Sequence, residues 1–119
     1  MSTPVMQFQI LSRNPQETAE FYSALFGWTV AADNAMGYRQ IDTGSPKGIH
    51  GGIWPAPPQA PNMVQLFAAV PDVKSASGKA VSLGAKMIIP PTILPEGDEI
   101  AVLQDPHGMP FGIMLDRTR

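Results

Sequence analysis

Cysteine is absent from the sequence, which excludes disulfides, thiolate metal sites and a cysteine nucleophile. Charged residues are scarce, at 15% of the chain against a usual share of about 25%. This shortage predicts that part of the surface is covered, and we expect a homodimer. The net charge of −2 gives no reason to expect nucleic acid or an anionic membrane as a partner.

Long apolar runs are missing as well. No stretch approaches the roughly 20 apolar residues that cross a bilayer, so we expect no membrane segment. The opening residues, MSTPVMQFQI, lack the basic and then apolar pattern of a signal peptide. We therefore expect a cytoplasmic protein, and the length of 119 residues suits a single domain.

Proline and glycine are abundant instead, with 13 and 11 residues. The densest proline cluster is WPAPPQAPN, residues 54–62, near the midpoint of the chain. Such a cluster cannot form a helix or a central strand. It predicts a linker over residues 55–62, which joins module one, residues 1–54, to module two, residues 63–119.

Module one opens with a strand-like stretch over residues 5–11. A helix is predicted next, because Asn14 is a good N-cap and Pro15 suits the first helical position. Gly27 is predicted to end this helix. Trp28 follows the glycine and is expected to pack in the core.

Module two repeats this order. Residues 63–70 are apolar enough for a strand, and Asp72 is placed to cap the helix that follows. Gly84 is predicted to close that helix. Four apolar residues fall on one helical face and are expected to be its buried side: Val73, Ala76, Ala80 and Leu83.

Three short strands follow each helix. They are predicted over residues 28–32, 38–43 and 50–54 in module one, and over residues 86–90, 99–104 and 110–115 in module two. Each half is therefore predicted to have the order β-α-β-β-β. An internal repeat of this kind decides the interpretation of the whole fold.

Four segments make the sequence similar to a known family: FYSALFGW, VPDV, LGAK and LQDPHGMPFGI. On these segments it resembles the vicinal oxygen chelate superfamily, which includes glyoxalase I, bleomycin resistance proteins and extradiol dioxygenases. The resemblance implies an α+β fold of two βαβββ modules, which form a curled mixed sheet with a cleft.

The resemblance also indicates where a metal would be held. In metal-dependent members, four positions on the first and last strands of the modules face the cleft and carry His, Gln or Glu. These positions correspond to Gln7, Gln65, Gly112 and Gly52 or a neighbour of Gly52. Two amides and two glycines offer no charge to a dication, whereas zinc, iron and manganese sites use imidazole and carboxylate ligands. We therefore predict no metal, no cofactor and a cleft in which glycine leaves room for an organic ligand.

The other candidate site residues have ordinary structural interpretations as well. Gln7 and Gln65 either bind the ligand or hydrogen-bond water on a sheet face. His50 is either a non-standard metal ligand or general base, or a histidine at a strand edge. Trp54 either lines the cleft or packs in the core or a dimer interface.

Three functions remain open. The first is a metal-free protein that binds a small, partly apolar organic molecule, as bleomycin resistance proteins do. The second is a lyase, isomerase or dioxygenase-type enzyme that uses non-standard ligands such as His50 and Glu99, or no metal. The third is an interaction protein with a vestigial cleft. Neither the ligand nor a reaction follows from the sequence.

Overall fold

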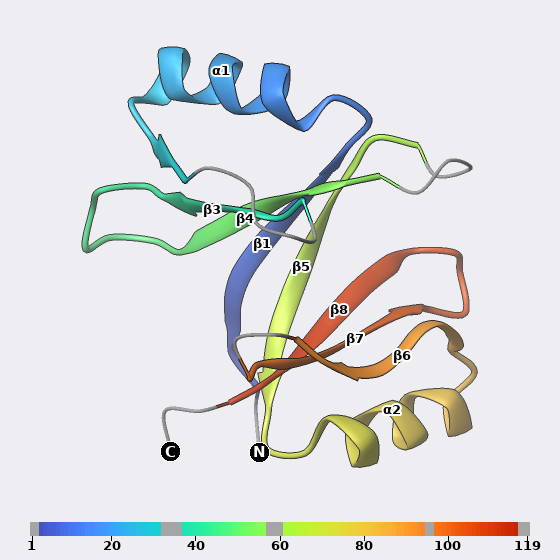
Figure 1. The fold of residues 1–119 in the computed structure, drawn as a ribbon. Helices are drawn as coiled ribbons and strands as arrows, with labels where there is room; N and C mark the ends of the chain where they lie inside the picture. Colours follow the sequence, from blue (N-terminus) through green and yellow to red (C-terminus); the bar gives the residue numbers. More distant parts are fainter. Residues whose placement is uncertain (1–2, 32–36, 57–60, 95–96, 117–119) are drawn as a thin grey trace. The chain divides into compact units, whose positions relative to one another are not determined.

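The computed structural model describes residues 3–31, 37–56, 61–94 and 97–116. The chain divides into two compact units, Met6–Gln65 and Leu66–Arg119 with Met1–Val5. One βαβββ module belongs largely to each unit (Figure 1). The α+β class and the repeated module predicted from the sequence are confirmed.

Module one is a four-stranded mixed sheet with one helix. Its elements are β1 (Val5–Ser12), α1 (Pro15–Phe26), β2 (Thr29–Val30), β3 (Arg39–Asp42) and β4 (His50–Pro55). The strand order is β2-β3-β4-β1, in which β4 runs parallel to β1 and antiparallel to β3. The return of β4 alongside β1 places residues from the two ends of the module next to each other.

The sequence signals at the ends of α1 work as predicted. The Asn14 side chain accepts a hydrogen bond from the backbone N–H of Glu17 at 3.2 Å, and Pro15 occupies the first turn. Gly27 ends the helix in the left-handed conformation, with φ of 74°. The helix packs on one face of the sheet, and Trp28 joins this core as predicted. The buried members of the core are Ile10, Ala19, Ile41 and Ile53.

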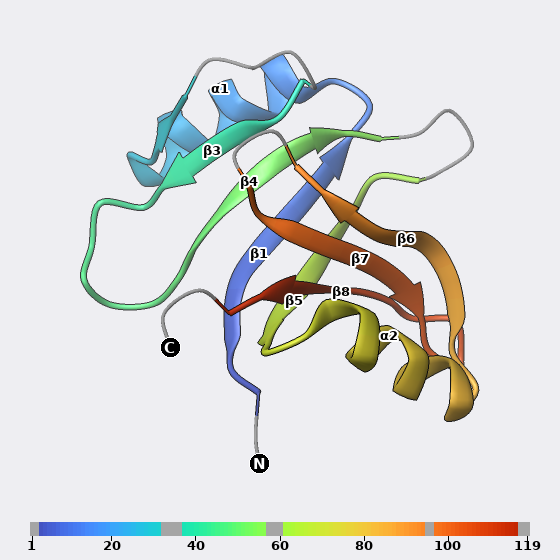
Figure 2. The same ribbon diagram turned by 60° about the horizontal axis from the view of Figure 1, so that its bottom comes forward.

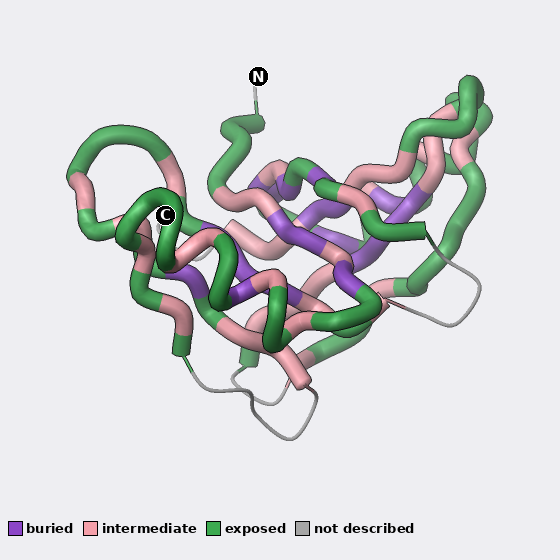
Figure 3. Tube along the Cα trace, turned by 90° about the horizontal axis from the view of Figure 1, so that it is seen from above, coloured by how far each residue is buried: buried purple, intermediate pink, exposed green. Residues whose placement is uncertain are grey.

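Module two has the same plan. Its elements are β5 (Met63–Val70), α2 (Val73–Ser82), β6 (Lys86–Ile93), β7 (Glu99–Gln104) and β8 (Pro110–Leu115). The strand order is β5-β8-β7-β6, and α2 lies along this sheet (Figure 2). The core between helix and sheet is aliphatic, and its buried members are Val70, Val73, Ala101, Leu103 and Ile113. In both modules the buried stretches fall mainly in the strands (Figure 3).

Four local predictions were wrong. Leu83 is 70% exposed, because α2 ends at Ser82 and Leu83 is its C-cap. β2 is only two residues long. β4 continues through Pro55, where the missing N–H is harmless at a strand end. β6 continues to Ile93 through two prolines, which an edge strand tolerates with register shifts.

Two further predictions concern the linker and a membrane segment. Residues 57–60 of the predicted linker lie outside the described residues. No helix in the described ranges has the length and apolar character needed to cross a membrane.

Candidate functional site

The candidate site residues of module one lie on the face of the sheet that α1 does not cover. Ile10, Ile41 and Ile53 point toward α1, and side chains alternate along a strand, so their neighbours point to the other side. We call this side the helix-free face of module one. Its residues on β1, on β4, on β3 and just before β3 include Gln7, Gln9, Leu11, Tyr38, Gln40, Asp42, His50, Gly52 and Trp54.

The first row across this face carries the ionisable groups. Gln7 on β1 lies opposite His50 on β4. His50 Nδ1 lies 3.5 Å from a carboxylate oxygen of Asp42. The backbone N–H of Thr43 donates to the same Nδ1 at 3.0 Å. Nδ1 is thus an acceptor in this arrangement, so the proton of the neutral ring belongs on Nε2.

The second row has glutamines on both sides of a glycine. Gly52 lies opposite Gln9 on β1 and Gln40 on β3. The Nε2 of Gln9 donates to Gln7 Oε1 at 2.8 Å, and Gln9 is only 4% exposed. Its Oε1 is buried and has no hydrogen-bond partner within the described part of the chain. This is an acceptor of the kind that normally finds a partner in proteins.

The third row is aromatic. The rings of Tyr38 and Trp54 lie 4.4 Å apart between centroids, at a tilt of 34°. A Cβ on Gly52 would overlap the ring of Tyr38. The room that this glycine leaves is therefore occupied by an aromatic ring of the same chain. The face passes from charged, through amide, to aromatic within three rows.

A hollow of about 340 Å³ lies on this face. The volume is at the lower end of the range of about 300–1,000 Å³ for small-molecule sites. Its side-chain lining includes Gln7, Tyr38, Gln40, Asp42 and His50. Two of the predicted site residues, Gln7 and His50, are thus brought to one concave surface, and Trp54 lies next to it through Tyr38.

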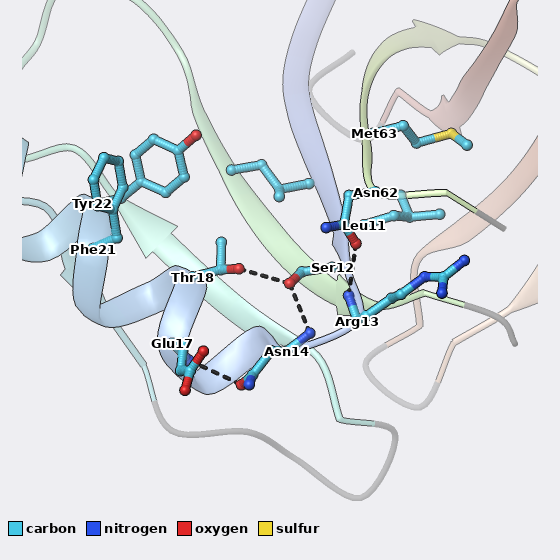
Figure 4. Close-up of a pocket in the computed structure, with 11 residues that line it drawn as sticks. Leu11, Ser12, Arg13, Asn14, Glu17, Thr18, Phe21, Tyr22, Asn62 and Met63 are labelled. Carbon is cyan, nitrogen blue, oxygen red and sulfur yellow. Dashed lines mark hydrogen bonds between the residues drawn. The ribbon is translucent and has the colours of Figure 1, made fainter.

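A second hollow, of about 420 Å³, lies where β1 leads into α1 (Figure 4). The hydroxyls of Ser12 and Thr18 are 2.6 Å apart, and the backbone N–H of Arg13 donates to Asn62 Oδ1 at 2.9 Å. The Asn14 side chain caps the helix. These polar groups bond to one another, so the contacts fix the chain entry into α1. Sequence reasoning did not anticipate this hollow.

Module two presents a different surface on the face opposite α2. Gly112 lies opposite Phe67 on β5 and Val102 on β7. A Cβ on Gly112 would overlap the ring of Phe67, which is 3% exposed. Gly112, one of the predicted site residues, therefore makes room for the buried ring of Phe67. Gln65, two residues before Phe67, is 4% exposed and donates to the sulfur of Met63 at 3.4 Å.

The residues at the positions where the resemblance implies metal ligands do not fit a transition metal. Gln7 and Gln65 supply neutral amides, while Gly52 and Gly112 supply no side chain and lie under aromatic rings. No group of three or more His, Cys, Asp or Glu residues comes together among the described residues. This donor set does not offset the loss of a dication's water shell. Glu99 opens β7 in the unit that does not contain His50.

Sequence reasoning missed Gln9, Gln40 and Asp42 on this face. Every second side chain along a strand points to the same face of the sheet. Gln9 is therefore expected on the same face as Gln7. That signal was in the sequence. The pairing of Gln9 with Gly52 was not, because it depends on the register of β1 against β4.

Three comparisons place the chain among known proteins. The sequence model of a family described as "Glyoxalase-like domain" matches residues 7–114. The proteins named "Putative glyoxylase CFP32" of Mycobacterium bovis and Mycobacterium tuberculosis are each 30% identical over 109 residues, which is 89% of this chain and 41% of theirs. The chain thus spans about two fifths of the length of these relatives.

Solved structures share the fold at low sequence identity. The hypothetical protein BH1468 from Bacillus halodurans has a TM-score of 0.71 and 12% identity, with 100% of this chain and 98% of that chain covered. A methylmalonyl-CoA epimerase variant from Streptomyces coelicolor, in complex with 2-nitronate-propionyl-CoA, has a TM-score of 0.66 and 16% identity. The match covers 99% of this chain and 97% of the epimerase.

Proposed function

The chain belongs to the glyoxalase-like domain family, and from this premise we propose that it binds a small, partly apolar organic molecule without a metal. The ligand lies on the helix-free face of module one. The enclosure of a cleft by the two modules stays a prediction. The activity of the longer relatives is no guide to this chain, because the chain spans only 41% of their length.

One observation carries the proposal: the gradient across the helix-free face. Amide and ionisable groups line one part of the hollow, and the Tyr38–Trp54 ring pair lies beside it. Small-molecule sites combine an apolar surface with a few polar groups that fix the ligand's orientation. The family's metal positions hold amides and glycines, so the polar groups of this face are left to bind the ligand directly.

The two tryptophans allow a direct test. Trp54 lies on the helix-free face, whereas Trp28 packs in the core under α1. In a Trp28→Phe variant, a bound ligand should change the fluorescence of Trp54. In the matched Trp54→Phe variant, the same ligand should leave the fluorescence of Trp28 unchanged. A response that persists only in Trp54→Phe would place the ligand elsewhere and contradict the proposal.

Metal content provides an independent test. We expect protein purified without chelator to carry well under one equivalent of any transition metal, measured by elemental analysis. Added zinc, nickel or manganese should leave the melting temperature unchanged. A true organic ligand at 100 times its dissociation constant should instead add about 2.7 kcal/mol of stability. Stoichiometric metal, with a raised melting temperature, would contradict the metal-free proposal.

An enzyme remains the second candidate, because of the orientation of one side chain. The Thr43 N–H holds His50 so that Nε2 carries the proton of the neutral ring. Such a ring donates a hydrogen bond from Nε2 to a ligand oxygen, and this bond would polarise a carbonyl group of a substrate. Under the binding proposal, His50→Gln changes affinity alone. A large loss of turnover at unchanged affinity, on any compound that the protein converts, would favour the enzyme.

Association with a second copy is also a proposal. Four large apolar side chains on β6 are exposed: Met87, Ile88, Ile89 and Ile93. Exposed apolar patches of this kind often mark interaction sites. Light scattering at several concentrations should show a dimer, and a concentration-independent monomer would contradict the proposal. A dimer that binds no small molecule would favour the interaction protein with a vestigial cleft.

A further inference from the structure

We propose that the helix-free face of module one selects a ligand that is uncharged or cationic and donates a hydrogen bond, and that it rejects anions. This inference rests on the proposed function, since it specifies what the same face binds. Two features carry it: the charge of the hollow and the state of its histidine.

The charge of the hollow comes from one carboxylate. Asp42 lines the hollow with its side chain 70% exposed, and none of the other described lining residues is Lys, Arg, Asp or Glu. Lys47, in the segment between β3 and β4, is not among the lining residues. An anionic ligand would meet a carboxylate with no permanent cation beside it, whereas an ammonium group would meet the opposite charge.

His50 does not reverse this balance in the observed arrangement. Its Nδ1 accepts the backbone N–H of Thr43 at 3.0 Å, and an accepting nitrogen carries no proton. The ring is therefore neutral while this bond is made. Its Nε2–H offers one donor, and no positive charge, to the contents of the hollow.

Gln9 does not contribute to this selection, because its Oε1 is buried and the residue is not part of the lining of the hollow. The hydrogen-bond donor on the ligand is instead matched to the Asp42 carboxylate, which accepts hydrogen bonds and donates none.

The expected ligand class differs from that in one structural neighbour. The Streptomyces coelicolor epimerase is seen with 2-nitronate-propionyl-CoA, and coenzyme A carries several phosphates. Phosphates are bound by Arg, Lys and helix N-termini. The described residues that line the hollow on the helix-free face of module one include no Arg or Lys, so we expect this face not to bind CoA thioesters.

The test uses two probes of similar size and opposite charge. Tyramine carries a phenol and an ammonium group, and 4-hydroxyphenylacetate carries the same phenol and a carboxylate. Their affinities are measured by calorimetry on the wild-type protein and through Trp54 fluorescence in the Trp28→Phe variant. We expect tyramine to bind more tightly by about fivefold, the upper range for one exposed charge pair.

Two variants assign this preference to residues. Asp42→Asn should bring the ratio of the two affinities close to one, whereas Glu20→Gln, which removes the same charge from exposed α1, should leave the ratio unchanged. Circular dichroism checks that each variant is folded.

The outcomes separate the two proposals. Equal affinities, or a preference for 4-hydroxyphenylacetate, would overturn the inference and leave the proposed function in place. A tyramine preference that survives Asp42→Asn would overturn it as well. If neither probe perturbs Trp54 or gives heat up to its solubility limit, both the inference and the binding function on this face are overturned.

Discussion

The faces of the two sheets that carry no helix share a backbone plan and differ in chemistry. The middle row reads Gln9, Gly52 and Gln40 in module one, and Phe67, Gly112 and Val102 in module two. In both rows the central glycine makes room for an aromatic ring. The two modules therefore share the central glycine, but the ring that covers it comes from different positions: Tyr38 before β3 in module one and Phe67 on β5 in module two. The flanking side chains are amides in one module and apolar groups in the other.

This difference separates binding from stability. The Oε1 of Gln9 is buried with no hydrogen-bond partner among the residues that the structure describes, which costs stability, while neighbouring polar side chains of this face line a hollow. Phe67 and Val102 are nearly fully buried and apolar, which stabilises the fold and offers a ligand little to hydrogen-bond. The two modules thus share one fold, but the middle row of the helix-free face is polar in module one and apolar in module two.

The strongest way to test this comparison is to make module two polar. Phe67→Gln replaces a ring that is 3% exposed with a buried amide, and it should lower the free energy of unfolding by about 3 kcal/mol or more. Urea unfolding measures the change. Phe21→Gln, at a position that is 58% exposed, is the control and should cost little. A cost below about 1 kcal/mol for Phe67→Gln would show that this face is not a packed core.

The two glycines should respond unequally. Gly112→Ala forces the buried ring of Phe67 to move, at a cost of about 2 kcal/mol for an overpacked core. Gly52→Ala displaces Tyr38, which is only partly buried, and should cost less. Adding Phe67→Leu to Gly112→Ala should restore part of the lost stability. Equal costs for the two glycines in urea unfolding would contradict the proposed difference between the faces.

A gain in stability is expected from the opposite change in module one. Gln9→Leu removes a buried acceptor that has no partner in the described chain, and should raise the free energy of unfolding by up to about 1 kcal/mol. Thermal unfolding measures the change. A destabilised variant would contradict this expectation and show that the Gln9 amide is structural.

The smallest expected effect concerns acid stability. The backbone N–H groups of Met109 and His107 donate to Asp105 Oδ1 at 3.0 and 2.8 Å, and these bonds lower the pKa of its carboxyl below the usual value. A lowered pKa stabilises the folded state above the carboxyl's unfolded pKa, and this stability is lost as the pH falls through the folded value. Asp105→Asn should therefore flatten the fall in melting temperature below about pH 4. An unchanged acid profile would contradict this.

Much of the fold followed from local signals. Asn14, Pro15 and Gly27 define α1 through rules that involve only neighbouring residues, and the structure confirms them. The bounds of β7 and β8 were also predicted correctly. Leu83 and the proline-containing end of β6 were misjudged, because the end of a helix and the edge position of a strand depend on tertiary context.

The site was predicted less completely than the fold. The sequence marked Gln7, His50 and Trp54, and the structure places them on one face of module one. It did not reveal that Phe67 lies over Gly112 or that Tyr38 lies over Gly52, because these contacts require cross-strand register. From the sequence, Gly52 and Gly112 are interpreted as leaving free space for a ligand. In the structure, an aromatic ring of the same chain occupies the space beside each glycine.

The prolines of β6 have a consequence for the behaviour of the protein at high concentration. Pro90 and Pro91 lie in the strand that forms one edge of the sheet of module two, among exposed apolar side chains. An edge of this composition would normally recruit further strands and start cross-β assembly. Adjacent residues direct their backbone N–H groups to opposite sides of a strand, so one proline of this pair removes a donor from the open edge. The edge is therefore a poorer template for a further strand than its apolar side chains alone would make it.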